Sequence, residues 1–352
     1  MVKTKFNPEL IKKLQKAVVK NKLDAYFVTD YKDQLYLTGF KFYPQEAILL
    51  VTPKEVYCYT RDLYIIELGQ KIPLLKASAP LDYALAAAEQ AKKLKLKNVG
   101  FDAVKTYYNY GKTFEKFGYK PSAFTPGELR EVKEKSELDT MRKANRIAYK
   151  TYEYIKKYIK TGMSEFEVAA EIERYMKSQG ATALSFESTV CFGVNGTNTH
   201  HTPTKDKLKN EQAILLDFGC IYDNYCSDIS RSWWHGKKPT AEYKKAWKAV
   251  DDARKAGIKA AKPGITGKEL DLVPRNVIEK AGFGKYFIHR TGHGIGMQAH
   301  EDPNVEPQNN RKFVANNVIT IEPGIYYTGH FGIRIEDTVV VTPKGGVILT
   351  KK

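Results

Sequence analysis

The feature that most limits the fold of this chain is a predicted β-hairpin with two aspartates, over residues 213–232. An apolar run leads to Asp217, the chain turns near Asp223, and the return strand carries Asp228. Whether the turn is centred just before or just after Asp223, Asp217 and Asp228 lie on one face, directly opposite or diagonal to each other. Two like charges held that close repel each other, and a cation between them removes the repulsion. The alternative is that one or both aspartates face water.

A glycine-rich segment further along the chain concentrates histidines. Three of the seven histidines, His289, His293 and His300, fall within twelve residues. Gly292 and Gly294 flank His293 and allow the backbone and a ligand to approach it closely. A lone histidine is more often structural than a ligand, but this clustering in a glycine-rich loop favours a site.

Two apolar segments near the C-terminus also carry carboxylates. The strand predicted over residues 318–324 delivers Glu322 to its end. Arg334 and Glu336 lie two positions apart, so we expect them on one face of a single strand. The arginine would keep the carboxylate beside it ionised. Taken alone, this last pair is better explained as a surface salt bridge between strands.

Together these segments supply an oxygen-rich set of side chains with one imidazole: Asp217, Asp228, His293, Glu322 and Glu336. The four carboxylates balance the charge of two divalent cations. Two cations that share bridging carboxylates and a hydroxide activate water and polarise a carbonyl group at once. We therefore expect a two-metal hydrolase. Manganese is the expected ion, with cobalt or zinc able to substitute, because oxygen ligands suit harder ions.

The first part of the chain has no such cluster. Its apolar spacing predicts alternating elements, with helices over residues 8–21 and 81–93 and strands over residues 24–29, 47–51, 56–59 and 98–101. This alternation predicts an α/β domain. Pro126 and Gly127 punctuate the chain, so we expect an N-terminal domain over residues 1–125 and a second domain over residues 126–352.

The second domain is expected to begin with helices and to end in strands. A long helix is predicted over residues 136–159, with Ser136 and Asp139 as its capping pair. Gly180 is expected to end the next helix. The remaining predicted elements are helices over residues 164–179, 241–261 and 267–281 and a strand-rich end over residues 318–350.

Composition and charge limit the alternatives. No apolar run suits a signal peptide or a membrane span, so we expect a cytoplasmic location and no membrane partner. The formal net charge of +17 leaves a nucleic-acid partner open, but the lysines are scattered as on solvated helix faces, which disfavours it. None of the four cysteines forms a C-x-x-C pair. Cys220 and Cys226 are expected on opposite faces of the hairpin, so no structural disulfide is predicted.

Several of these segments are similar to the motifs of one enzyme family. The strings LLDFG, CSDISR, TGHGIG, TIEPGIY and GIRIEDT occur in that order. In them the chain resembles the family of creatinase, aminopeptidase P, prolidase and methionine aminopeptidase, over about residues 131–350 and more loosely before that. The resemblance implies an α+β protein with a creatinase-like α/β domain followed by a pita-bread catalytic domain. It also implies hydrolysis of Xaa-Pro bonds, with a homodimer as the expected assembly and an Xaa-Pro dipeptide or short peptide as the substrate.

The resemblance assigns roles to individual residues. The five residues of the oxygen-rich set match metal-ligand positions, with Asp228 and Glu336 where the family bridges both metals and Glu322 where it transfers a proton. His200 and His300 match positions that touch the substrate and assist catalysis. The positions expected to bind the substrate are His200, His289, His300 and Arg334.

The sequence departs from the family pattern in three places. The family often has Pro-His at the first substrate histidine, but here Thr199 precedes His200 and His201 follows. Either histidine could serve, and His200 is favoured. Asn316–Asn317 replace a usual glycine, and asparagine tolerates a left-handed turn. Trp233–Trp234 follow the hairpin without an evident reason.

The leading interpretation is an Xaa-Pro dipeptidase, with an aminopeptidase P that acts on longer Xaa-Pro peptides as the closest alternative. The metal ligands of the two are the same, so the sequence does not separate them. The size of the N-terminal region disfavours a methionine aminopeptidase. The intact ligand set disfavours both a metal-free, creatinase-like hydrolase and a non-catalytic binding protein.

Overall fold

The structure, a computed structural model, describes residues 6–350. Its internal contacts divide into two compact units, Met1–Arg130 and Glu131–Lys352. No helix among the described residues combines the length and the apolar character needed to cross a membrane.

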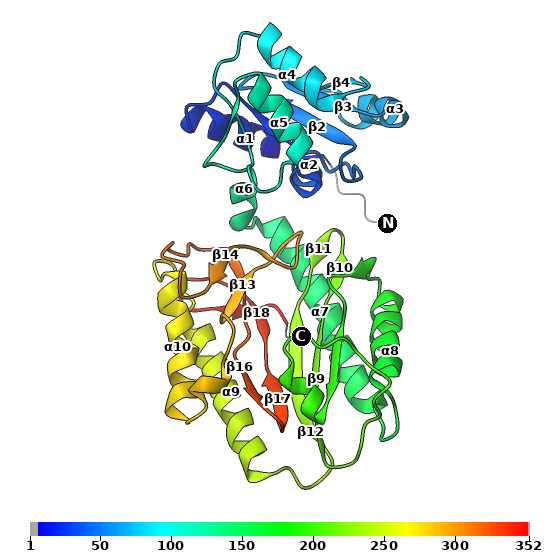
Figure 1. The fold of residues 1–352 in the computed structure, drawn as a ribbon, viewed down its shortest axis with the longest axis vertical. Helices are drawn as coiled ribbons and strands as arrows, with labels where there is room; N and C mark the ends of the chain where they lie inside the picture. Colours follow the sequence, from blue (N-terminus) through cyan, green and yellow to red (C-terminus); the bar gives the residue numbers. More distant parts are fainter. Residues whose placement is uncertain (1–5, 351–352) are drawn as a thin grey trace. The chain divides into compact units, whose positions relative to one another are not determined.

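The first unit is built on one mixed sheet with the strand order β4-β3-β2-β1-β5-β6 (Figure 1). Its strands are β1 (Ala25–Val28), β2 (Ala47–Val51), β3 (Val56–Thr60), β4 (Leu75–Ser78), β5 (Val99–Phe101) and β6 (Lys120–Pro121). Its helices are α1 (Pro8–Lys20), α2 (Tyr31–Thr38), α3 (Asp62–Lys71), α4 (Tyr83–Lys93) and α5 (Tyr108–Lys116), and α6 (Glu128–Glu131) lies at the division between the units.

The core of this unit follows from the alternation of side chains along its strands. Phe27, Ile48 and Leu50 project to the face that the alanines of α4 and Phe114 of α5 cover. The rings of Phe27 and Phe114 stack with their centroids 4.0 Å apart. The predicted elements of this region match α1, β1, β2, β3, α4 and β5. The helices α2, α3 and α5 and the strands β4 and β6 were not predicted.

The second unit consists of two halves, each with strands inside and a pair of helices outside (Figure 1). In the first half, α7 and α8 pack on strands that include β8, β10 and β11, and in the second half α9 and α10 pack on β15, β17 and β14. The halves meet where β12 contacts β17 and β18. The first half contains α7 (Lys135–Tyr158), α8 (Glu165–Ser178), β7 (Ala183–Leu184), β8 (Thr189–Phe192), η1 (Gly193–Thr197), β9 (Gln212–Phe218), β10 (Cys220–Tyr222), β11 (Tyr225–Cys226) and β12 (Ile229–His235). The second half contains α9 (Ala241–Ala260), α10 (Gly267–Lys280), η2 (Gly284–Tyr286), β13 (Gly292–Gly294), β14 (Glu301–Val305), β15 (Val318–Ile321), β16 (Gly324–Tyr327), β17 (Phe331–Arg334), β18 (Asp337–Val340) and β19 (Val347–Ile348).

The predicted aspartate hairpin is present, and its turn is centred just after Asp223. Asp217 of β9 is paired with Ser230 of β12, so Asp217 and Asp228 are diagonal neighbours. The return strand is not continuous, because the chain leaves the ladder between β11 and β12, where Asp228 lies. The two strands approach closely at Gly219, where an added Cβ would lie 1.9 Å from the carbonyl oxygen of Ser227. The cysteines Cys58, Cys191, Cys220 and Cys226 are buried free thiols.

Two local expectations were wrong. Helix α7 begins at Lys135, one residue earlier than predicted, so Ser136 lies inside the first turn and does not cap it. Instead the Glu137 carboxylate accepts a hydrogen bond from the backbone N–H of Glu134 at 2.8 Å. Arg334 and Glu336 do not share one strand, because Arg334 ends β17 and Glu336 lies before β18.

The tryptophan pair and the asparagine pair now have structural explanations. The Trp234 indole N–H donates to Glu211 at 2.9 Å, and the ring packs against Tyr243 with centroids 5.1 Å apart. Trp233 packs on the apolar core of the first half and contacts Tyr152 edge to face. Asn316 has a φ of 68°, the left-handed turn expected for a residue that replaces glycine.

Candidate metal centre

The five residues of the oxygen-rich set come from both halves of the second unit. The first half supplies Asp217 on β9 and Asp228 just before β12. The second half supplies His293 on β13, Glu322 just after β15 and Glu336 just before β18. Asp217 and His293 therefore lie on strands, while the other three lie directly beside strand ends, where the backbone N–H groups of Glu322 and Glu336 donate to Thr291 and Ser230. Asp228 is 4% exposed, so the alternative in which it faces water is wrong.

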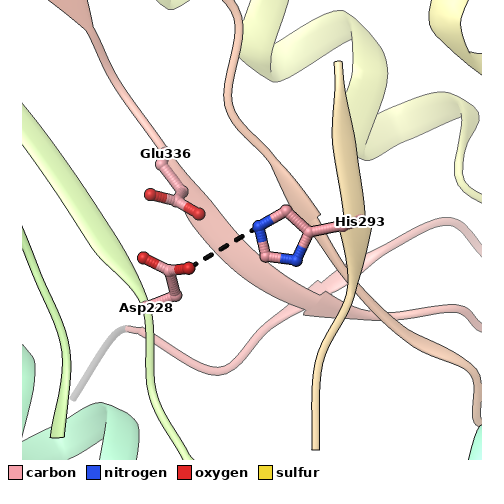
Figure 2. Close-up of side chains that lie close together, drawn as sticks. All are labelled: Asp228, His293 and Glu336. Atoms are coloured by element: carbon pink, nitrogen blue, oxygen red, sulfur yellow. Dashed lines mark ion pairs between the residues drawn. The ribbon is translucent and has the colours of Figure 1, made fainter. Parts of the chain in front are cut away.

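Three of these side chains meet in a single cluster (Figure 2). One ligand atom from each of Asp228, His293 and Glu336 lies within 4.8 Å of the others, and all three residues are buried. The Nε2 atom of His293 lies 3.7 Å from Asp228 Oδ2 and 3.2 Å from Glu322 Oε1. Two carboxylates from opposite halves of the unit thus face one imidazole nitrogen.

The backbone orients His293 for this role. Its Nδ1 lies 3.0 Å from the carbonyl oxygen of Gly294, and because a carbonyl only accepts, Nδ1 carries a proton. The remaining nitrogen, Nε2, points at the carboxylates. A histidine that holds its ring by donating Nδ1–H in this way presents Nε2 to a metal ion. Gly292 allows β13 to lie close to β15, because an added Cβ at this position would lie 2.0 Å from the carbonyl oxygen of Thr320.

The carboxylates are buried together without enough hydrogen-bond donors. Asp217 Oδ1, Asp228 Oδ1 and Glu336 Oε1 are buried and receive no hydrogen bond from any of the described residues. Burial raises the pKa of Asp228 and Glu336 well above the ordinary range, and the neighbouring carboxylates raise it further. Burial also raises the pKa of Asp217, although Arg334 opposes the shift. Buried charges need a partner of opposite sign, so these unpaired oxygens fit a divalent cation.

Glu322 differs from the other carboxylates in its surroundings. Burial raises its pKa, but the close contact with His293 and the electrostatic influence of His289 and Arg334 outweigh burial and lower the pKa to about 2. Its Oε1 accepts a hydrogen bond from the Thr320 hydroxyl at 3.0 Å. The side chain keeps 15% of its surface exposed and lines the adjoining cavity.

Arg334 pairs across the two halves with Asp217 and not with Glu336. Its guanidinium donates to Asp217 Oδ2 at 2.5 Å, to the Tyr326 hydroxyl at 2.6 Å and to the Ser230 hydroxyl at 2.9 Å. The explanation of Arg334 and Glu336 as a surface salt bridge is wrong, because both side chains are buried. The Ser230 hydroxyl in turn donates to Glu336 at 2.8 Å.

A chain of hydrogen bonds extends from this arginine to His289. The Nδ1–H of His289 donates to the carbonyl oxygen of Arg290 at 2.7 Å, and burial lowers the pKa of the ring, so His289 is neutral. Its Nε2 therefore accepts from the Tyr326 hydroxyl at 2.9 Å. The hydroxyl can donate there because it accepts from Arg334.

The four residues expected near the substrate line one cavity beside the cluster. This cavity has a volume of about 570 Å³, within the range of small-ligand sites. His300 packs edge to face on His293 with ring centroids 4.1 Å apart, and burial together with His293 lowers its pKa to about 4. His300 is therefore neutral at neutral pH. The cavity is lined by Asp217, Asp228, His293 and Glu322 together with His200, His289, His300 and Arg334.

Sequence reasoning missed the residues that support the site. Tyr326 stands in the string TIEPGIY, but a tyrosine in a strand most often indicates packing, and its partners come from distant segments. Asp271 of α10 was also missed. Its carboxylate accepts from the backbone N–H of Thr291 at 2.9 Å and binds Arg275, which donates to the carbonyl oxygen of His289 at 3.0 Å. This pair fixes the segment that leads to His293.

Comparisons with known proteins identify the family and the fold. Residues 139–343 match metallopeptidase family M24, and residues 11–135 match the creatinase/prolidase N-terminal domain. The predicted fold class is thereby confirmed. A Mycoplasma pneumoniae protein, provisionally named as an Xaa-Pro aminopeptidase, is 37% identical over 342 residues, 96% of each chain. An Xaa-Pro dipeptidase from Bacillus anthracis superposes with a TM-score of 0.92 at 30% identity, covering 98% of this chain and 97% of that one. A prolidase from Pyrococcus horikoshii superposes with a TM-score of 0.89 at 30% identity and covers 98% of each chain.

Proposed function

This chain belongs to metallopeptidase family M24, and from its buried carboxylate cluster we propose that it hydrolyses the Xaa-Pro bond of dipeptides with two divalent cations. The cations are held by Asp217, Asp228, His293, Glu322 and Glu336. The observation that carries the proposal is the set of buried carboxylate oxygens that receive no hydrogen bond from the described residues. The names of the dipeptidase, the prolidase and the aminopeptidase similar to this chain support an Xaa-Pro bond as the target.

In this proposal each side chain has a distinct task. The two cations, when bound, polarise the scissile carbonyl group and lower the pKa of a water molecule. The Glu322 carboxylate takes a proton from the attacking water and passes it to the proline nitrogen. His300, a neutral ring on the cavity wall, donates a hydrogen bond to the substrate, and His200 does so from another part of the wall. Arg334 holds Asp217 and, through Tyr326, the ring of His289.

Metal removal tests the two-cation proposal. Treatment with a chelator should abolish hydrolysis of Ala-Pro, and titration should restore it at two ions per chain. Manganese should restore the activity best, with cobalt and zinc as weaker substitutes, because four carboxylates and one imidazole favour harder ions. Full activity of the chelator-treated protein would refute a metal-dependent mechanism.

Substrate length separates the dipeptidase from the closest alternative, an aminopeptidase P. Ala-Pro, Ala-Pro-Ala and Ala-Ala are digested side by side with metal added. We expect rapid cleavage of Ala-Pro, slow cleavage of Ala-Pro-Ala and none of Ala-Ala, which controls for the requirement for proline. Faster cleavage of Ala-Pro-Ala would favour the aminopeptidase, which the name of the Mycoplasma pneumoniae relative suggests.

We also propose that the active form is a homodimer, as the family resemblance implies. Light scattering on the eluate of a sizing column measures the mass directly. A mass of twice that of the 352-residue chain supports the proposal, and a monomeric mass in the active fraction contradicts it.

A further inference from the structure

A buried carboxylate outside the metal centre binds a segment that lines the cavity. Glu165, the first residue of α8, is 0% exposed. Its Oε1 accepts from the backbone N–H of Phe192 at 2.8 Å and from the Asn195 amide at 2.9 Å. Its Oε2 accepts from His201 Nε2 at 2.7 Å and from the N–H and the hydroxyl of Thr204 at 2.9 and 2.8 Å. One carboxylate thus receives five hydrogen bonds from one segment, residues 192–204, which begins at the end of β8, includes η1 and is called the loop below.

This loop carries His200 and His201 on the cavity wall. Glu165 binds His201, whose side chain keeps only 12% of its surface exposed, whereas His200 is exposed and its ring makes no hydrogen bond with the described residues. The start of the loop is fixed from its other side by β17. An added Cβ at Gly196 would lie 2.9 Å from the backbone nitrogen of Gly332, so the two backbones are in direct contact. The loop is therefore held between Glu165 and β17.

We propose that Glu165 is a positioning residue that holds the loop 192–204 so that His200 faces the substrate. The hydrogen bond from His201 to Glu165 is one of the contacts that attach the loop. The part assigned to His200 rests on the proposed function. The attachment of the loop to Glu165 does not, because it follows from the five hydrogen bonds alone.

The variant Glu165→Gln tests this attachment sharply. An amide has one oxygen and one NH₂ group. Each carboxylate oxygen of Glu165 accepts from a different backbone N–H, and the direction of a backbone N–H is fixed by the chain. In one orientation the NH₂ group faces the N–H of Phe192, and in the other it faces the N–H of Thr204. Either way a buried donor is left without an acceptor, which disfavours the attached loop.

Hydrogen–deuterium exchange measures the loop without any substrate. In the full-length Glu165→Gln protein we expect the amides of Phe192 and Thr204 to exchange roughly tenfold faster or more, while β9 and β12 keep their protection. The matched control is Glu171→Gln, the same change on the same helix, where the carboxylate binds Tyr154 and Arg174 instead. His201→Ala removes one donor and should loosen the loop less, so it serves if the first variant does not fold.

Kinetics on Ala-Pro with manganese then tests the link to His200. Glu165→Gln should raise KM and lower kcat/KM on the order of 10²-fold, with the metal content of the wild-type protein, because no metal ligand is touched. In a His200→Ala background the same change should cost little more, because residues that act through one another are not additive.

Three results would overturn the proposal: unchanged exchange in the loop, unchanged kcat/KM, or an equal loss in the His200→Ala background. Failure of the proposed function looks different. A wild-type protein that does not cleave Ala-Pro refutes the function, while the exchange experiment still reports whether Glu165 holds the loop.

Discussion

Arg334 and Asp217 lie 117 positions apart in the chain, yet the guanidinium Nη2 is 2.5 Å from the carboxylate Oδ2. The same guanidinium also donates to Ser230 and Tyr326. Its planar, forked set of N–H donors therefore links β9, β12 and β16 at the metal centre. An ammonium group offers a point charge without this fork. The relationship gives the first prediction.

Arg334→Lys should keep the charge beside Asp217 and still lower kcat/KM on the order of 10²–10³-fold, because the bonds to Ser230 and Tyr326 cannot all be kept. Steady-state kinetics with metal added measures the loss. Arg174→Lys is the matched control, since Arg174 also binds a carboxylate with two nitrogens, on the surface at Glu171. Wild-type kinetics in Arg334→Lys would show that the fork has no role in the site.

Glu322→Gln should nearly abolish turnover, by roughly 10²–10⁴-fold. The amide keeps the shape and can still accept from Thr320, but it cannot take a proton. It also removes one of the four balancing negative charges, so some metal affinity should be lost. Single-turnover kinetics at saturating metal isolates the chemical step. A variant with wild-type turnover would refute the proton-transfer role.

His300→Ala should weaken turnover less, on the order of 10²–10³-fold, and keep its metal. The reason is that His300 packs on the ring of His293 but lies outside the proposed ligand set. His293→Ala, in contrast, should lose metal. Elemental analysis of both variants separates the two roles, and metal loss in His300→Ala would mean that the wrong histidine was assigned as the ligand.

Glu137→Gln should change the pH dependence of stability. Burial raises the pKa of Glu137 above its ordinary value of 4.5, and its oxygens accept from Tyr225 and from the backbone of Glu134. The stability that Glu137 contributes is fully present below about pH 4.5 and is lost as the pH rises through the higher folded-state pKa. The wild type should therefore lose stability relative to Glu137→Gln as the pH rises.

Urea unfolding of both proteins at about pH 5, 7 and 9 measures this difference. Other groups titrate equally in the two proteins, so the difference isolates Glu137. If the free energy of unfolding changes with pH by the same amount in both proteins, the raised pKa of Glu137 is contradicted.

Gly292→Ala should destabilise the protein by more than ~1 kcal/mol and release the metal, because the new methyl group collides with the backbone of Thr320 and displaces the strand that carries His293. Gly69→Ala is the control. It lies in α3 with no atom within 4 Å of the added Cβ, and alanine should stabilise that helix by up to ~1 kcal/mol. Thermal unfolding and elemental analysis compare the two, and equal behaviour would contradict the close approach at Gly292.

The sequence by itself determined the features that depend on neighbouring residues. The hairpin and the shared face of Asp217 and Asp228 were predictable, because both possible turn positions give the same face when side chains alternate with a period of two. The helices α7–α10 were predicted as well, and Gly180, which has a φ of 101°, follows the end of α8 as expected.

Only the tertiary structure decided which distant groups became partners. In the tertiary structure the return strand is interrupted at Asp228, and Arg334 binds Asp217 and not Glu336. Glu165 receives five hydrogen bonds there. A local pattern specifies which way a side chain points along its own strand or helix. The acceptor that a buried donor finds depends on which other segments pack against it, and that is settled only in the packed tertiary structure.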